Sequence, residues 1–194
     1  SNVLARRAAV YATAVAEESA TGGRVVAAPS AGSAGPVAAL LQLWRDDRPL
    51  QLDDGIVDFL LTGAAIGGML RAAGLHHAGC QSEIGVAAAM AAAGYASVLG
   101  ASNEQVVLAA DLALRPHLGL TCDPAGGRIE DPCIGRNAAA ASRACLAALD
   151  AVRAPSPRNG IDATIRAMVA SGQRMAARPK STSLSGVAVS LAEC

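Results

Sequence analysis

The segment formed by residues 83–99 consists mostly of alanine, valine and methionine, and only its first residue, Glu83, is charged. This composition predicts a helix that is buried on all sides, without a polar face. Gly85 and Gly94 lie inside it, where each glycine costs about 1 kcal/mol relative to alanine. We therefore expect other parts of the chain to approach this helix closely at the two glycines.

The composition of the whole chain supports the same kind of packing. Apolar residues make up 52% of the 194 residues but aromatic residues only 2%. The core must therefore be built from small side chains, which let helix backbones lie close together. The length fits one domain with a core of its own. We expect an all-α fold, a compact single helical domain that comprises residues 1–194.

Apolar periodicity, capping residues and breaks at proline and glycine predict seven helices. They cover residues 3–20, 36–44, 53–73, 83–99, 103–114, 134–153 and 160–178. The third contains the apolar run 56–70, which is shorter than the roughly 20 residues that span a bilayer and includes Asp58. We interpret this run as a second buried core helix.

Charge and cysteine content limit the partners and the compartment. The chain has 16 acidic and 16 basic residues, so no net field attracts nucleic acid or an anionic membrane, and neither partner is expected. Its five cysteines are an odd number, and we expect no secretory signal. Both points favour the reducing cytoplasm.

Three of the cysteines lie at breaks between predicted helices. Cys122 and Cys133 share a loop that contains two prolines and two glycines, and Cys80 precedes the segment 83–99. Thiols held by turns suggest a metal site, either zinc or an iron–sulfur cluster. Zinc sites usually contain paired Cys-x-x-Cys, which is absent here, whereas clusters accept widely separated thiolates, so the spacing favours a cluster. Cys145, on an alanine- and leucine-rich helix face, is predicted to be a core residue.

Polar residues near these cysteines have more than one interpretation. Three histidines fit a metal ligand, a base or a plain polar loop residue: His76, His77 and His117. Arg136 follows Cys133 in the first turn of a helix, where a guanidinium can bind a substrate carboxylate with two hydrogen bonds. An ion pair of Arg136 with Asp123 or Asp131 is the alternative.

A turn of glycine, serine and alanine, residues 29–35, precedes the second helix. Its small residues leave backbone N–H groups and the hydroxyls of Ser30 and Ser33 open at a helix N-terminus, which is a ready site for a carboxylate or phosphate. An ordinary glycine-rich turn is the alternative.

Four motifs together resemble a known family. They are Ala28-Pro-Ser-Ala-Gly-Ser-Ala-Gly35, Gly79-Cys-Gln-Ser-Glu-Ile-Gly85 with Met90-Ala-Ala-Ala-Gly94, Leu118-Gly-Leu-Thr-Cys-Asp-Pro124 and Pro132-Cys-Ile-Gly-Arg-Asn-Ala138. In this order they resemble the α chain, or α domain, of the bacterial iron–sulfur L-serine dehydratases, and the resemblance runs from about Arg24 to the C-terminus.

The resemblance implies a lyase that converts a small amino-acid substrate, L-serine, to pyruvate and ammonia without pyridoxal phosphate. It implies a [4Fe-4S] cluster held by Cys80, Cys122 and Cys133, with a fourth iron open to act as a Lewis acid on the substrate. A base removes the α-proton, for which the candidates are His76, His77 and His117. The residues expected to hold the substrate are Ser30, Gly32, Ser33, Arg136 and Asn137.

Two segments depart from the family pattern. Gly74-Leu-His-His-Ala-Gly79 is shorter than its counterpart, and Arg115-Pro-His117 is unusual before Leu118. Another β-substituted amino acid is therefore the alternative substrate, and a non-catalytic, metal-stabilised partner subunit is the alternative role. The chain lacks the β domain of single-chain members, so it is expected to need a separate β chain or to be a reduced stand-alone enzyme, with a homodimer also open.

The apolar tail, residues 184–194, ends in Cys194, which carries a thiol next to its own carboxylate and so resembles a substrate. Single-chain family members also have a cysteine at or next to the C-terminus. We expect the tail to fold back to the cluster and Cys194 to occupy the open iron at rest. A solvent-exposed terminus is the alternative.

Overall fold

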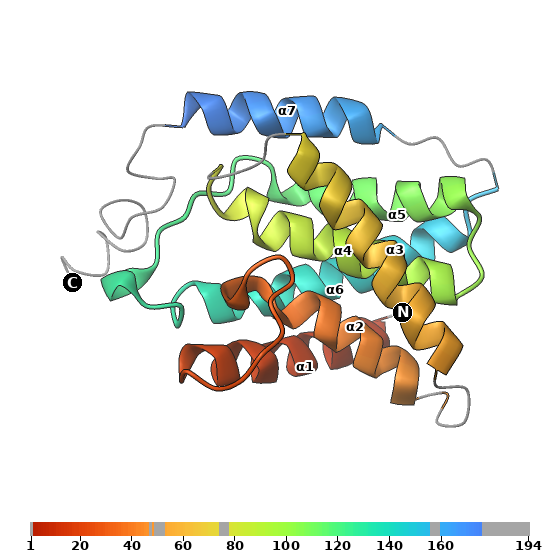
Figure 1. Ribbon diagram of the computed structural model, residues 1–194, viewed down its shortest axis with the longest axis horizontal. Coiled ribbons are helices and arrows are strands. Elements are labelled where there is room, and N and C mark those ends of the chain that lie inside the picture. Colours follow the sequence, from red (N-terminus) through yellow and green to blue (C-terminus); the bar gives the residue numbers. More distant parts are fainter. Residues whose placement is uncertain (1, 47, 49–52, 74–77, 156–159, 176–194) are drawn as a thin grey trace.

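A computed structural model describes residues 2–46, 48, 53–73, 78–155 and 160–175. These residues form seven α-helices joined by loops and short 3-10 turns, and no strand occurs among them (Figure 1). The helices are α1 (Asn2–Ala20), α2 (Gly35–Asp46), α3 (Asp53–Ala72), α4 (Ile84–Val98), α5 (Asn103–Leu114), α6 (Cys133–Val152) and α7 (Ile161–Arg174). The 3-10 turns are η1 (Ala31–Ser33), η2 (Cys80–Ser82), η3 (Arg115–His117) and η4 (Ala125–Gly127). The predicted all-α fold is confirmed.

The alanine-rich helix α4 is the centre of the fold, as predicted. It packs against α2, α3, α5 and α6, and all but a few of its residues are buried. Its glycines are points of close approach, since a side chain at Gly94 would place its first carbon 2.7 Å from the carbonyl oxygen of Phe59. At Gly85 the nearest atom is Cβ of His117, at 3.0 Å. Small residues in α4 thus set the short distances between the helices.

Helix α1 adds an outer layer to this core through a stripe of small residues. Ala5, Ala8, Ala12 and Ala16 are buried along one side of it, and α1 packs there against α6 and α2. The stripe has the spacing of one helix face, so α1 is amphipathic with an alanine core face.

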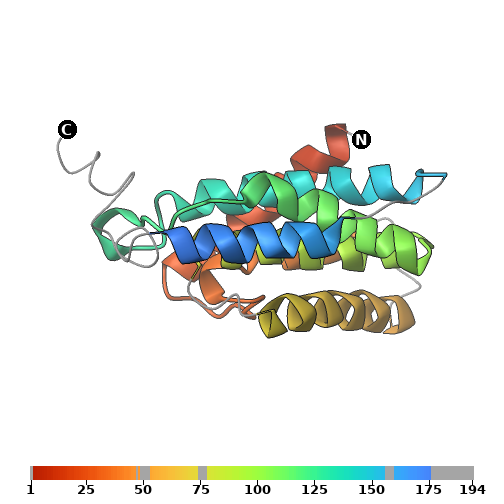
Figure 2. The same cartoon turned by 90° about the horizontal axis from the view of Figure 1, so that it is seen from above.

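The prediction for α3 is wrong in one respect. The apolar run 56–70 is not buried on all sides: Phe59, Ile66 and Leu70 face the core, but Leu61 is 65% exposed. Figure 2 shows α3 as the outermost layer on its side of the molecule. The helix also extends beyond the apolar run, so that Asp54–Ala72 is long and apolar enough to cross a membrane by length and composition, with 22% of that window buried. An apolar sequence pattern indicates that a helix face is covered, but it does not indicate whether the same chain or another molecule covers that face.

Candidate metal centre

Cys80, Cys122 and Cys133 come together at one end of the helical domain, where η2, the loop before η4 and the start of α6 meet (Figure 1). Cys80 and Cys133 are buried and Cys122 is half-buried. The thiols of Cys122 and Cys133 both hydrogen-bond to the sulfur of Cys80. Three residues that are separated by up to 53 positions in the sequence therefore present one group of sulfur atoms.

The three thiols shift one another's pKa values in opposite directions. Hydrogen bonds from Cys122 and Cys133, with the nearby Arg136 guanidinium, hold the pKa of Cys80 well below its usual range. The pKa values of Cys122 and Cys133 are raised, first by their hydrogen bonds to Cys80 and then by burial. A metal bound by all three sulfurs would release the protons that they carry.

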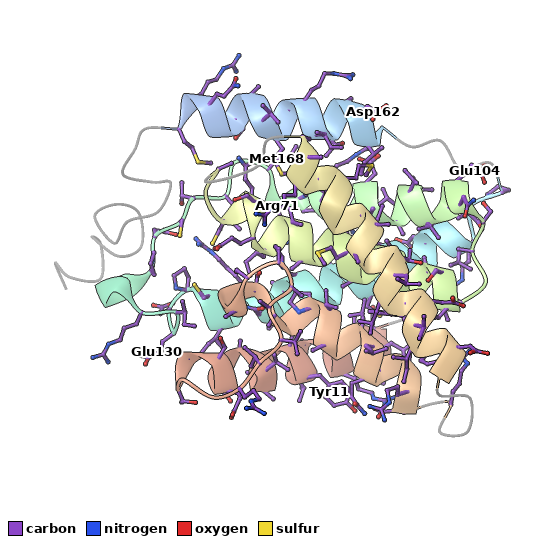
Figure 3. The ribbon with its side chains drawn as sticks, in the orientation of Figure 1. Tyr11, Arg71, Glu104, Glu130, Asp162 and Met168 are labelled. Carbon is purple, nitrogen blue, oxygen red and sulfur yellow. The ribbon has the colours of Figure 1, made fainter. Side chains whose placement is uncertain are left out.

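Gln81 fixes the position of the Cys80 turn. Its side chain is fully buried, donates from Nε2 to the carbonyl of Met168 on α7 at 3.2 Å, and accepts at Oε1 from the Gly119 N–H at 2.8 Å. Its backbone N–H donates to the carbonyl of Leu120 at 3.1 Å. Met168 points from α7 toward α4 (Figure 3). One glutamine therefore ties η2 both to α7 and to the loop that leads to Cys122.

Gly79 makes this close approach possible. It has φ +74° and ψ −169°, a backbone conformation that side chains disfavour. A side chain there would also place its first carbon 2.7 Å from the carbonyl oxygen of Leu120. Glycine is the residue that fits before Cys80.

Arg136 joins the Cys122 loop to the first turn of α6. Its NH1 group lies 2.8 Å from Oδ1 of Asp123 and donates to the carbonyl of Thr121 at 2.9 Å. This is one of the two ion pairs that the sequence left open as alternatives to substrate binding. The guanidinium also interacts with the sulfur of Cys80, so it offsets negative charge at the thiols.

Asn137 holds the turn 29–35 against the metal centre. Its buried side chain donates from Nδ2 to the carbonyls of Gly32 and Cys133, both at 2.8 Å, and accepts at Oδ1 from the Gly35 N–H at 3.0 Å. A predicted substrate residue thus anchors the predicted substrate turn to the helix that begins with Cys133.

Within that turn the two serines bond to each other. The hydroxyls of Ser30 and Ser33 lie 2.9 Å apart, and the Ser30 N–H donates to Oγ of Ser33 at 3.2 Å. Ser33 is buried, while Ser30 and Gly32 are half-buried. Ser30 is therefore the more accessible hydroxyl of the pair, and the role of the turn in substrate binding stays a prediction.

His117 is buried beside the metal centre. Burial lowers its pKa, so the imidazole is neutral near pH 7. Its Nδ1 lies 2.9 Å from the carbonyl of Ala113, which can only accept, so Nδ1 carries the proton and Nε2 the free lone pair. His117 lines a cavity of about 330 Å³ together with Arg136, Arg143 and an apolar wall. The other candidate bases, His76 and His77, lie outside the described residues, as does Cys194.

Sequence reasoning missed two polar residues here, Gln81 and Glu83. The carboxylate of the half-buried Glu83 and the sulfurs of Cys80 and Cys122 all lie within 4.8 Å of one another. The spacing could have indicated Glu83, because it follows Cys80 by three residues, which is about one helical turn. Cys145, by contrast, is fully buried on α6, as predicted, and burial raises the pKa of its thiol to about 11.

The chain is similar to known proteins along nearly its whole length. The family model described as serine dehydratase alpha chain matches residues 1–188. The chain belongs to this family. It is 44% identical over 189 residues to the L-serine dehydratase of Streptomyces coelicolor, covering 95% of this chain and 42% of that protein. L-serine dehydratase 2 of Escherichia coli is 43% identical over 189 residues, with the same coverage. The L-serine dehydratase of Mycobacterium bovis is 45% identical over 190 residues, 94% of this chain and 41% of that protein.

This chain of the serine dehydratase alpha chain family spans less than half the length of the curated relatives that it matches. The matched region contains all the described residues of the metal centre.

Proposed function

We propose that this chain is the catalytic part of an iron–sulfur L-serine dehydratase, which eliminates water from L-serine to form pyruvate and ammonia. The observation that carries the proposal is the convergence of three thiols, Cys80, Cys122 and Cys133, beside the Arg136 guanidinium. The relatives that this chain matches are L-serine dehydratases, and they supply the proposed substrate. The proposal for the cofactor is a [4Fe-4S] cluster.

The residues fit such a cluster. Three thiols at separate loop and helix ends are a ligand set that clusters accept, and Cys-x-x-Cys pairs typical of zinc are absent from the sequence. The positive charge of Arg136 offsets part of the negative charge that three thiolates bring. When bound, the cluster would supply a Lewis-acid iron that polarises the substrate's carboxylate and β-hydroxyl.

The chain's own residues would bind the substrate and move its proton. His117 is neutral with a free lone pair at Nε2, which suits it to accept the α-proton. Ile84, Leu120 and Ala139 line the same cavity and would exclude water from the reacting atoms. Glu83 is the second candidate for this proton, since its carboxylate lies beside Cys80.

The substrate itself needs a direct test, because Arg115, Pro116 and His117 depart from the family pattern near the proposed site. Another β-substituted amino acid is the second candidate. A panel of β-hydroxy, β-thio and phosphorylated amino acids, assayed for ammonia and keto acid, would separate the two. The assay should be repeated with an added β polypeptide, since more than half of each relative lies outside the match.

The deciding experiment is anaerobic purification and reconstitution, followed by iron and sulfide analysis. We expect about four irons and four sulfides per chain, and their loss in Cys80→Ser. Cys145→Ala is the matched control, because this buried cysteine on α6 lies away from the thiol group and should keep the cluster. Stoichiometric zinc without sulfide would overturn the proposal and leave a metal-stabilised partner subunit as the function.

A further inference from the structure

A cavity of about 220 Å³ lies where the end of α3, the loop before α2 and the start of α4 meet. Its polar lining is Arg71 and Ser82, and its wall includes Gly68, Val86 and Met90. It shares no lining residue with the cavity beside the metal centre, so the two cavities are separate. Its volume is several times the roughly 30 Å³ that one water occupies in the liquid, so a small organic molecule fits.

The positive charge of Arg71 has no counter-charge in this cavity. No aspartate or glutamate lines it, and among the described residues Arg71 takes part in no ion pair. Arg71 belongs to the last turn of α3, and Figure 3 labels it between the end of that helix and the loop before α2. A guanidinium presents a fork of N–H donors that matches a carboxylate or a phosphate with two parallel hydrogen bonds. The cavity therefore suits an anion.

Ser82 offers the opposite kind of group. Its hydroxyl donates to the carbonyl of Gly79 at 2.7 Å, so its one hydrogen is used and its lone pairs remain to accept. An ammonium group carries only donors and can donate to such an oxygen. An α-amino acid, which has a carboxylate and an ammonium, would satisfy Arg71 and Ser82 together, whereas phosphate would satisfy Arg71 alone.

Two glycines of α3 keep the cavity open. A side chain at Gly68 would meet nothing within 4 Å, so the space beside this residue is free. At Gly67 the first carbon of a side chain would lie 2.9 Å from the sulfur of Met90, which belongs to the wall of the cavity. Glycine inside a helix is less favourable than alanine, and at these two positions it leaves room for a ligand.

We propose that this cavity binds a small free amino acid, with its carboxylate on Arg71 and its ammonium on Ser82. The apolar wall of Val86 and Met90 accommodates a short side chain and has no partner for a charged one. Ser82 ends the turn that begins with Cys80, so the ligand would contact the turn that presents one of the three thiols. The site does not depend on a cluster, and it differs from the cavity in which we place the lyase reaction.

Equilibrium dialysis of the full chain with L-alanine, with and without reconstituted metal, tests the proposal. L-Alanine has both charged groups but no β-substituent to eliminate, so the proposed lyase activity cannot consume it. We expect binding in both preparations. Propionate and ethylamine each lack one of the two charged groups, so each should bind roughly tenfold more weakly.

Gly68→Leu and Arg71→Gln change the two sides of the site. Leucine favours the helix and finds open space at position 68, so this variant should fold, fill the cavity and abolish binding. Arg71→Gln should weaken binding roughly tenfold, and Arg71→Lys by less, because lysine keeps the charge but loses the fork. An arginine that only complements the negative end of the α3 dipole would leave L-alanine binding unchanged in both Arg71 variants.

Arg166→Gln is the matched control, because Arg166 is exposed on α7 and lines neither cavity. This variant should bind L-alanine like the parent chain. A parent chain that binds no L-alanine would overturn the proposal, as would binding that survives both Gly68→Leu and Arg71→Gln. Inorganic phosphate that binds as tightly as L-alanine would also overturn it, because the site would then recognise any anion. Iron and sulfide analysis tests the lyase proposal separately, so either proposal can fail alone.

Discussion

Gln81→Met removes the side-chain bonds that connect the Cys80 turn to its surroundings while nearly preserving shape. The change deletes the bonds to Met168 and Gly119, so the Met168 carbonyl keeps only its helical partner and the Gly119 N–H loses its acceptor. A lost bond with an unsatisfied partner costs about 1–3 kcal/mol, so we expect a loss of about 2 kcal/mol in the free energy of unfolding. The loop that carries Cys122 should also move relative to Cys80, and iron should be released faster.

Urea unfolding measures the first effect, and the rate of iron release to a chelator measures the second. Gln173→Met is the matched control, since Gln173 is exposed on α7 and its loss should change neither quantity. If Gln81→Met costs less than about 1 kcal/mol and retains iron like the parent chain, Gln81 does not hold the metal centre together.

Four further predictions concern single residues. Gly79→Ala should cost about 2–3 kcal/mol in urea unfolding, because of its positive φ and the 2.7 Å approach to Leu120. Asn137→Ala removes the three hydrogen bonds that the asparagine side chain makes with backbone groups, and it should cost about 3 kcal/mol in the same assay. His117 has a pKa lowered from 6.5 by burial, so below pH 6.5 the unfolded chain binds a proton that the folded chain does not. Stability should therefore fall as the pH drops from 6.5 toward the folded pKa, and His117→Asn should flatten that fall. Removal of Cys194 should keep the cluster but raise its oxygen sensitivity; an unchanged visible spectrum and lifetime in air would exclude Cys194 as a ligand.

The helices could be predicted because local chemistry sets them. Ser102 caps α5 through the bonds expected of a serine with glutamine three residues on, and the alanine run of α4 has no polar face to expose. The position of the three cysteines at breaks between helices could be predicted as well, since proline and glycine place them in turns. These signals are all contained within a few residues of sequence.

What could not be predicted depends on contacts between distant residues. Gln81 forms hydrogen bonds with Gly119 and Met168, which lie 38 and 87 positions further along the chain, and the residues next to Gln81 do not indicate these partners. The pairing of Arg136 with Asp123, not Asp131, follows from the path of the loop between them. The exposure of Leu61 could not be predicted for another reason. The same apolar pattern fits a surface that is covered by the chain itself and one that is covered by a partner.

Trp44 is the only tryptophan in the chain and lies almost fully buried at the end of α2. A side chain at Gly55 would place its first carbon 2.2 Å from the indole ring, so this glycine of α3 lies directly against it. The fluorescence of Trp44 should therefore shift to longer wavelength when α3 separates from α2 and water reaches the indole ring. The visible absorption of a metal centre would report the opposite end of α2. Recorded together, the two signals would tell a protein that has lost its metal from one that has lost its fold.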